Sequence, residues 1–188
     1  GIRVIYSGEG ADEMFGGYLY FHHCPNPMEM QKELVRKMNR LYTYDLLRTN
    51  KSCMGASIEL RPPFLNKDFV EFVMNIDPAM KMADYCKDKV IEKYILRKAF
   101  ESYLPPQIIW RQKEQFSDGV GYRWIDHIKE KAEELVSDED FDKAHILYPV
   151  SPPTSKEMMM QRRNFEEFYR APASILTVPY AKSVACST

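Results

Sequence analysis

Residues 2–13, IRVIYSGEGADE, bring a short apolar run directly to a loop with two glycines and three carboxylates. Residues 2–6 predict a buried strand, and the small residues after Tyr6 predict the loop in which that strand ends. A helix is expected to begin near Ala11. A lone buried strand leaves backbone groups unpaired on both sides, so it needs neighbouring strands, which we expect upstream of Gly1. The start at Gly1 instead of Met also indicates a fragment or a processed product.

Apolar periodicity predicts that most of the remaining chain is helical. The clearest pattern follows the break at residues 25–27, where apolar residues recur at the spacing of one helical face: Leu34, Val35, Met38, Leu41, Tyr42 and Leu46. Further helices are expected at about 67–75, 90–104, with Pro105 and Pro106 as its stop, and 122–136. The last helix is expected to begin at Thr154, which can form a capping box with Glu157.

Composition limits the class of protein. The chain has 188 residues, 45% of them hydrophobic, which fits one domain or a large piece of one and excludes a disordered chain. A net charge of −1 gives no overall field for nucleic acid or an anionic membrane surface, so neither partner is expected. No apolar run approaches a membrane span, and no secretory signal opens the chain, so we expect a cytoplasmic protein. Its cysteines lack zinc or disulfide-framework spacing: Cys24, Cys53, Cys86 and Cys186.

The loop at residues 7–13 combines an anion-binding geometry with negative charge. A small-residue loop before a helix N-terminus exposes backbone N–H groups that suit a phosphate or nucleotide. Its three carboxylates, Glu9, Asp12 and Glu13, would repel a bare phosphate. The loop therefore makes sense as a phosphate site only with magnesium, or if a carboxylate acts on the substrate. It matches neither a Walker A loop nor a G-x-G-x-x-G fingerprint, and simple helix capping is the alternative.

Asp45 is placed by the periodicity on the apolar face of its helix, four residues after Leu41. A buried carboxylate costs free energy unless it is paired or bound to a metal ion. Arg48, one turn later, is the structural partner that would explain Asp45 without a functional role. The same alternative applies to Glu59 and Arg61.

Residues 110–121, WRQKEQFSDGVG, bring two cations to a glycine-containing loop. Arg111 and Lys113 could hold a departing pyrophosphate, because a cation stabilises the negative charge that develops in the transition state. A solvated turn is the alternative.

Together these segments resemble the glutamine-hydrolysing asparagine synthetases, with matching order and spacing. The resemblance covers nearly the whole chain. It is carried by SGEGADE at 7–13, FGGYLYFH at 15–22, YD at 44–45 with NK at 50–51, Arg61 with PFL at 63–65, WRQKEQFSDGVG at 110–121, TVP at 177–179 and SVACST at 183–188.

The resemblance implies an α/β domain of the adenine nucleotide alpha hydrolase-like, ATP pyrophosphatase type. Residues 1–188 would be the C-terminal portion of that single synthetase domain, mostly α-helical with one short N-terminal strand. The implied reaction uses ATP and Mg²⁺ to adenylate the side chain of aspartate, giving β-aspartyl-AMP and pyrophosphate. Ammonia, released from glutamine by an N-terminal glutaminase domain of the same polypeptide, then displaces AMP. A homodimer is a further partner that the resemblance allows.

The resemblance also implies roles for residues 7–13, which we call the acidic loop. Ser7 and Gly8 would contact the nucleotide. Glu9 would act at the β-aspartyl-AMP intermediate and help to deprotonate the incoming ammonia. Asp12 would be a magnesium ligand.

Two residues outside the loop receive roles in the same way. Asp45 would stand near the metal and the pyrophosphate, and Lys113 would neutralise the pyrophosphate as it leaves. Five side chains would support these groups: Glu13, Tyr18, Arg48, Glu59 and Arg61.

The sequence departs from the family pattern at residues 54–57, where a Trp-containing segment is expected, at Asn66, where Asp is usual, and at 180–182, where a Trp- and Gly-containing turn is usual. These departures affect the contacts expected on the substrate side.

Two parts of the family are absent from these 188 residues: the Ser-Gly-Gly-x-Asp-Ser (PP) loop half, which wraps the pyrophosphate end of ATP, and the glutaminase domain. We therefore expect the isolated chain to have no synthetase or glutaminase activity. A β-lactam synthetase-like adenylating enzyme is one alternative, although the match at 110–121 argues against it. A non-catalytic helical interaction module or remnant is the other.

Overall fold

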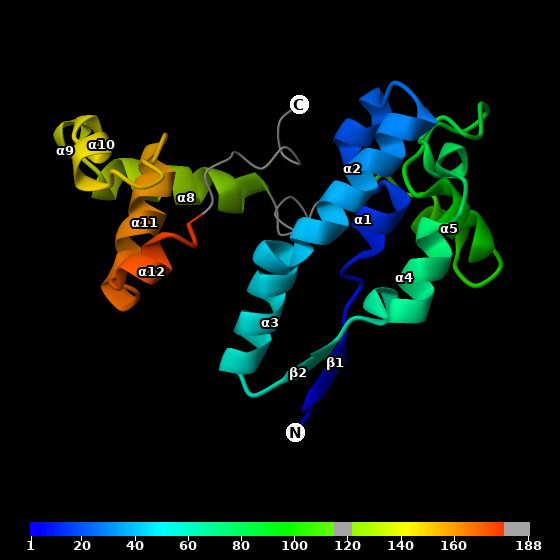
Figure 1. The fold of residues 1–188 in the computed structure, drawn as a ribbon, viewed down its shortest axis with the longest axis horizontal. Helices are drawn as coiled ribbons and strands as arrows, with labels where there is room; N and C mark the ends of the chain where they lie inside the picture. Colours follow the sequence, from blue (N-terminus) through cyan, green and yellow to red (C-terminus); the bar gives the residue numbers. More distant parts are fainter. Residues whose placement is uncertain (115–121, 179–188) are drawn as a thin grey trace. The chain divides into compact units, whose positions relative to one another are not determined.

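The computed structural model describes residues 1–114 and 122–178, without the side chain of Tyr122 (Figure 1). The chain divides into two compact units, one comprising Gly1–Lys113 and the other beginning at Glu114. Each unit is described by itself below. In the described ranges, no helix is long and apolar enough to cross a bilayer.

A two-stranded parallel sheet opens the first unit. Strand β1, Val4–Tyr6, lies beside β2, Glu59–Arg61, in Figure 1. The register pairs Val4 with Glu59, Ile5 with Leu60 and Tyr6 with Arg61. The pairing continues at both ends, where the Glu59 N–H donates to the Arg3 carbonyl and the Ser7 N–H to that of Arg61. The sheet therefore fixes the start of the acidic loop against residues far along the sequence.

Two expectations about this sheet were wrong. One strand was predicted, but Glu59–Arg61 is a second. Three residues directly before Pro62 are too short for periodicity to reveal a strand. The strand β1 is also not buried in the described structure, because Val4 is 36% exposed and Tyr6 75%.

Helix α1, Ala11–Phe15, begins where the sequence predicted. Glycines with positive φ flank it, Gly10 at 95° and Gly16 at 62°. A Cβ on Gly10 would come within 2.3 Å of the Leu65 side chain, so the tight turn into α1 requires glycine. The short 3₁₀ helix Leu19–His23 follows.

The predicted helix through Leu46 is two helices. Helix α2, Pro27–Arg40, ends in a 3₁₀ turn, Leu41–Thr43, and α3, Asp45–Gly55, begins after it. The backbone of Tyr44, with φ −122° and ψ −110°, leaves the helical region, and the Thr43 hydroxyl bonds the Arg40 carbonyl at 2.7 Å.

This break corrects the expected apolar face. Leu34 and Met30 are fully buried, whereas Val35 is 42% exposed and Tyr42 67%. Asp45 opens α3 and does not continue the buried stripe of α2.

Short helices complete the first unit. After a 3₁₀ turn at Pro63–Leu65, α4 spans Lys67–Met74, capped by the Asn66 side chain, and a second turn spans Pro78–Lys81. The helix expected at 90–104 is only α5, Tyr94–Ala99, and Pro106 begins α6, Pro106–Ile109. Proline suits a first helical position because that position's N–H has no helical partner.

The first unit has two apolar clusters. One holds Tyr18, Phe21, Met30 and Leu34, and the other holds Met14, Phe15 and Val73. Both include residues beside the acidic loop, so core packing positions this loop.

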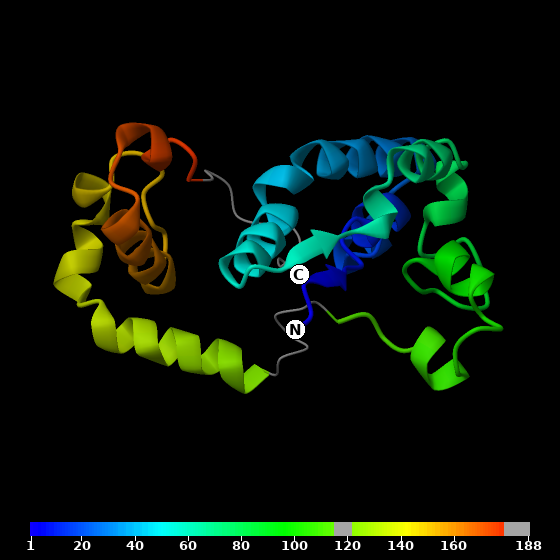
Figure 2. The same cartoon turned by 90° about the horizontal axis from the view of Figure 1, so that it is seen from below.

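The second unit is helical. Helix α8, Tyr122–Leu135, packs against α11, Lys156–Phe168, as Figures 1 and 2 show. In the described part of this unit, three short helices accompany them: α9, Asp138–Asp142, α10, Ala144–Leu147, and α12, Pro172–Ile175. The core of this unit contains Val136, Ala144 and Met159.

The start of α11 lies one residue beyond the predicted cap. Ser155, not Thr154, is the N-cap, and its hydroxyl accepts the Met158 N–H at 3.2 Å. The Thr154 hydroxyl lies against the Met158 sulfur instead. Both hydroxyls are good caps, so backbone geometry decided between them.

Candidate functional site

Asp12 in α1 is contacted by two lysines from distant segments. Lys93 Nζ lies 2.9 Å from Asp12 Oδ1, and Lys113 Nζ lies 3.5 Å from Oδ2. A Cβ on Gly17 would come within 1.9 Å of Oδ1, so glycine at this position leaves room for the carboxylate. The structure thus brings together the two residues to which metal and pyrophosphate roles were assigned, Asp12 and Lys113.

Lys93 is a member of this cluster that sequence reasoning missed. It immediately precedes α5 and has a φ of 56°, which a non-glycine residue rarely adopts. Such backbone strain persists where surrounding structure imposes it, often at functional sites. No local sequence signal identifies it, because neither glycine nor asparagine stands at this left-handed position.

A second cluster joins two carboxylates through a tyrosine. The Tyr18 hydroxyl donates a short hydrogen bond to the Glu13 carboxylate and lies 3.4 Å from Asp45 Oδ2. Glu13 is only 3% exposed. Burial raises the pKa of its carboxyl, the Tyr18 bond opposes that rise, and the charges of Asp12 and Asp45 add to it.

The same burial and carboxylates raise the pKa of the Tyr18 hydroxyl. Lys37 in α2 places its ammonium 4.8 Å from the Tyr18 ring centre, within cation–π range. Desolvation lowers the pKa of Lys37. Tyr18 is therefore held as a neutral hydrogen-bond donor between two helices.

Glu9 reaches the same region through Thr49 of α3, which sequence reasoning also missed. The Thr49 hydroxyl lies 2.7 Å from Glu9 Oε1 and 2.8 Å from the Asp45 carbonyl oxygen. The Ser7 hydroxyl accepts the Glu9 N–H at 3.2 Å, and a Cβ on Gly8 would meet no atom within 4 Å. Gly8 therefore leaves the loop open to approach.

The remaining predicted residues form ion pairs at the surface. Arg48 pairs with Asp45 one turn away, and Arg61 Nε lies 2.7 Å from Glu59 Oε1. The Arg48 and Arg61 side chains are 65% and 54% exposed. These pairs match the structural alternative. Arg61 supports the acidic loop through its carbonyl, which accepts the Ser7 N–H.

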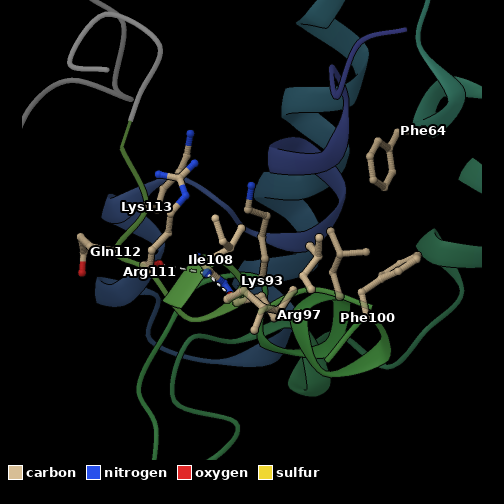
Figure 3. Close-up of a pocket in the computed structure, with 11 residues that line it drawn as sticks. Phe64, Lys93, Arg97, Phe100, Ile108, Arg111, Gln112 and Lys113 are labelled. Carbon is tan, nitrogen blue, oxygen red and sulfur yellow. Dashed lines mark hydrogen bonds between the residues drawn. The ribbon is translucent and has the colours of Figure 1, made fainter. Parts of the chain in front are cut away.

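A pocket of about 420 Å³ opens beside Lys93 and Lys113. Figure 3 shows its two kinds of lining, with Lys93, Arg111 and Lys113 on one side and the Phe64 and Phe100 rings on the other. A lining that is cationic on one side and aromatic on the other suits an anionic ligand with an apolar part.

The metal site was tested against the described side chains. Within residues 1–114 and 122–178, no group of three or more His, Cys, Asp or Glu side chains could hold a metal ion. Magnesium needs fewer protein ligands, because it keeps several waters and binds substrate phosphates. The buried Asp12 Oδ1 accepts no well-aligned hydrogen bond, although Lys93 is near. Asp12 thus fits one carboxylate of such a site.

The comparison with protein families decides the family. The asparagine synthase family model matches residues 1–28 and 24–184. The chain belongs to the asparagine synthase family.

Some predicted features lie outside the described residues. These are residues 115–121, Pro179, the departure at 180–182, the motif at 183–188 and Cys186 within it.

Similar proteins come from bacteria and plants. The chain is 50% identical over 188 residues to asparagine synthetase B (glutamine-hydrolysing) of Escherichia coli K12, covering 100% of this chain and 33% of that protein. It is 50% identical over 192 residues to the glutamine-hydrolysing asparagine synthetase 2 of Oryza sativa and to the nodule asparagine synthetase of Pisum sativum, covering 100% of this chain and 32% and 33% of those proteins. The chain thus spans about a third of the length of these relatives.

Proposed function

We propose that these residues are part of an enzyme that makes asparagine from aspartate, with ATP as energy source and glutamine as nitrogen donor. The observation that carries the proposal is the pairing of Asp12 with Lys93 and Lys113 at an acidic loop that Gly8 leaves open. A carboxylate flanked by two cations suits a metal-bound polyphosphate better than a structural ion pair, which needs one cation. Family membership and the names of the relatives support the same chemistry.

The fold proposal is an adenine nucleotide alpha hydrolase-like domain, to which β1 and β2 contribute two parallel strands. The rest of the polypeptide would supply the Ser-Gly-Gly-x-Asp-Ser loop, which is absent from this sequence, and the glutaminase domain that delivers ammonia. We expect a cytoplasmic enzyme, inactive when reduced to these 188 residues.

The two lysines would stabilise the leaving group of the first step. Aspartate's side-chain carboxylate attacks the α-phosphorus of ATP, forming β-aspartyl-AMP and releasing pyrophosphate. Lys113 and Lys93, held beside Asp12, would face the pyrophosphate, because positive charge that is already in place is most effective as negative charge develops. Asp12 would hold magnesium, which supplies neutralising charge to the phosphates when bound.

The acidic loop would serve both steps. Ser7 and Gly8 border the open part of the loop and would contact the nucleotide. Glu9, oriented by the Thr49 hydroxyl, would accept a proton from ammonia as its nitrogen attacks the activated carboxyl carbon and the bond from that carbon to the AMP oxygen breaks, releasing AMP. Tyr18 would hold Glu13 and Asp45 in place as a neutral donor.

The test is turnover by the complete polypeptide that contains these residues. With aspartate, ATP, Mg²⁺ and glutamine, we expect equal amounts of asparagine, AMP and pyrophosphate, and transfer of ¹⁸O from labelled aspartate to AMP. Glu9→Gln should abolish synthesis while folding is retained. Glu29→Gln, on the exposed start of α2, is the matched control. Turnover unaffected by Glu9→Gln would contradict the assignment.

The same assay separates the alternatives. A β-lactam synthetase-like enzyme would release pyrophosphate with a different carboxylate substrate and little with aspartate. A non-catalytic module would release no pyrophosphate with any carboxylate substrate. Asparagine formed by the 188-residue chain alone would refute its expected inactivity.

A further inference from the structure

A buried carboxylate outside the predicted site joins three segments of the first unit. Glu92 is 1% exposed. Its Oε1 accepts the Arg97 guanidinium at 2.7 Å and the backbone N–H of Lys113 at 3.0 Å. Its Oε2 lies 3.2 Å from His22 Nε2. One carboxylate thus contacts α5, the segment that ends at Lys113, and the 3₁₀ helix that follows Tyr18.

Arg97 also binds this segment. Its Nη1 donates to the carbonyls of Ile109 and Arg111 at 2.7 and 2.9 Å. Its Nε donates to the Glu92 carbonyl at 2.8 Å, so its own orientation is fixed. Glu92 and Arg97 together bind three backbone groups between residues 109 and 113.

This backbone needs such support because helix α6 ends at Ile109. Residues 111–114 belong to no helix or strand, so no regular hydrogen-bond ladder fixes them. A lysine side chain is long and has many rotamers, so the position of its ammonium depends on where its backbone is held. Lys113 nevertheless directs its ammonium to Asp12.

We propose that Glu92 and Arg97 are positioning residues that fix the backbone of Lys113 and so place its ammonium at the Asp12 site. The hydrogen bonds from Glu92 and Arg97 to the backbone of residues 109–113, which we call the clamp, do not depend on the proposed function. Their effect on catalysis rests on it. Neither residue has a described contact with Asp12, and both bind the backbone between residues 109 and 113, so we expect their effect to pass through Lys113. His22 adds a link from the same carboxylate to the segment after the Gly17 turn.

A double-mutant cycle in the complete polypeptide tests the catalytic part. Glu92→Gln keeps the size of the side chain and should lower kcat/KM for ATP by roughly 10- to 100-fold, the usual loss when an orienting partner is removed. KM for aspartate should change little. In a Lys113→Ala background, Glu92→Gln should have no further effect, because a residue that acts through Lys113 has nothing left to position. Losses that multiply in the double variant would overturn the proposal.

The matched control is Lys98→Ala, in the same helix as Arg97. Lys98 is 57% exposed and pairs only with Glu101 one turn away among the contacts described. The Lys98→Ala variant should leave kcat/KM for ATP unchanged. Arg97→Lys, which keeps the charge but loses the guanidinium fork, replaces Glu92→Gln in the cycle if that variant does not fold.

Amide hydrogen exchange tests the clamp without any activity. The Lys113 amide should exchange faster in Glu92→Gln and in Arg97→Lys than in the wild type, and at the wild-type rate in Lys98→Ala. Unchanged exchange in both clamp variants would overturn the clamp. Faster exchange in a polypeptide without synthetase activity would keep the clamp and reject the proposed function, so the two failures are distinguishable.

Discussion

The two units of the chain differ in how their buried polar side chains are hydrogen-bonded. In the second unit, Arg162 is 5% exposed and its guanidinium is bonded to Glu166 and to the carbonyls of Val150 and Ser151. In the described ranges, every buried side-chain nitrogen or oxygen without a hydrogen bond lies in the first unit: Gln31 Oε1, Lys81 Nζ and Asp12 Oδ1, the last in an ion pair with Lys93. Native proteins pair nearly all buried polar atoms, so unpaired ones require an explanation.

We propose that this difference separates structural polarity from the polarity of a functional site. Arg162 ties a proline-containing segment to α11 and has all its described partners within the unit. Glu13 and Asp45, in contrast, are carboxylates gathered around one hydroxyl, and Asp12 faces two cations. Like charges and strained residues cost stability, and they concentrate where a site is prepared for a ligand. The comparison leads to five predictions, in order of decreasing effect.

The largest effect is expected for lysine removal in the complete polypeptide. Lys113→Ala should lower kcat/KM for ATP by about 10²- to 10³-fold, because it removes charge stabilisation in the transition state. Lys156→Ala in the second unit removes a lysine that pairs with Glu133 and Asp138 and should leave turnover unchanged. Steady-state kinetics with pyrophosphate detection measures both. Equal losses of kcat/KM in the two variants would contradict a functional difference between the two units.

Opposite stability effects are expected for the two buried cations. Lys81→Met should stabilise the first unit by roughly 1–3 kcal/mol at pH 7, since it removes a buried ammonium without a described partner. Arg162→Met should destabilise the second unit, because Glu166 and two carbonyls lose their donor. Urea unfolding of the complete polypeptide, followed by hydrogen exchange in each unit, measures both changes. Destabilisation by Lys81→Met would reveal a partner for its ammonium.

The Lys81 effect has a defined pH dependence. Desolvation lowers the pKa of Lys81 from 10.5 to about 8 in the folded state. Between pH 8 and 10.5 the unfolded chain binds the proton and the folded chain does not, so stability contributed by this group rises with pH. The advantage of Lys81→Met over the wild type should therefore shrink across that window and be constant below it. An advantage that stays constant up to pH 10.5 would contradict the lowered pKa.

Two glycines of the first unit, Gly17 and Gly55, differ in the space around them. Gly17→Ala should cost roughly 1–3 kcal/mol and reduce activity, because its Cβ would displace the Asp12 carboxylate. Gly55→Ala, in the last turn of α3, meets no atom within 4 Å and should be neutral or stabilising by up to about 1 kcal/mol. Thermal denaturation and turnover of both variants provide the measurement. A neutral Gly17→Ala would mean that Asp12 is not held where described.

The smallest effect concerns the cap of α11 in the second unit. Ser155→Ala should destabilise by about 1 kcal/mol, the usual loss for an N-cap hydroxyl. Thr154→Ala should change stability by less, because its hydroxyl contacts only the Met158 sulfur among the contacts described. Denaturant midpoints compare the two variants. A larger loss for Thr154→Ala would restore the capping box predicted from the sequence.

The sequence by itself determined the family and the positions of several helices. The motif at 7–13 and the segment at 110–121 are local strings, and the family model confirmed the resemblance they indicated. The starts of α1 and α8 were predicted because glycines and apolar spacing are local signals as well. Local chemistry is sufficient where a helix is amphipathic and its ends are marked.

Tertiary structure alone decided what lies beside what. Parallel pairing made Glu59–Arg61 a strand, and the break at Tyr44 separated Asp45 from the face of α2. Lys93 joined Asp12, and Glu92 became the partner of the Lys113 backbone, through contacts between segments far apart in sequence. Such contacts leave no periodic trace in the chain, because they depend on packing that brings distant backbones together.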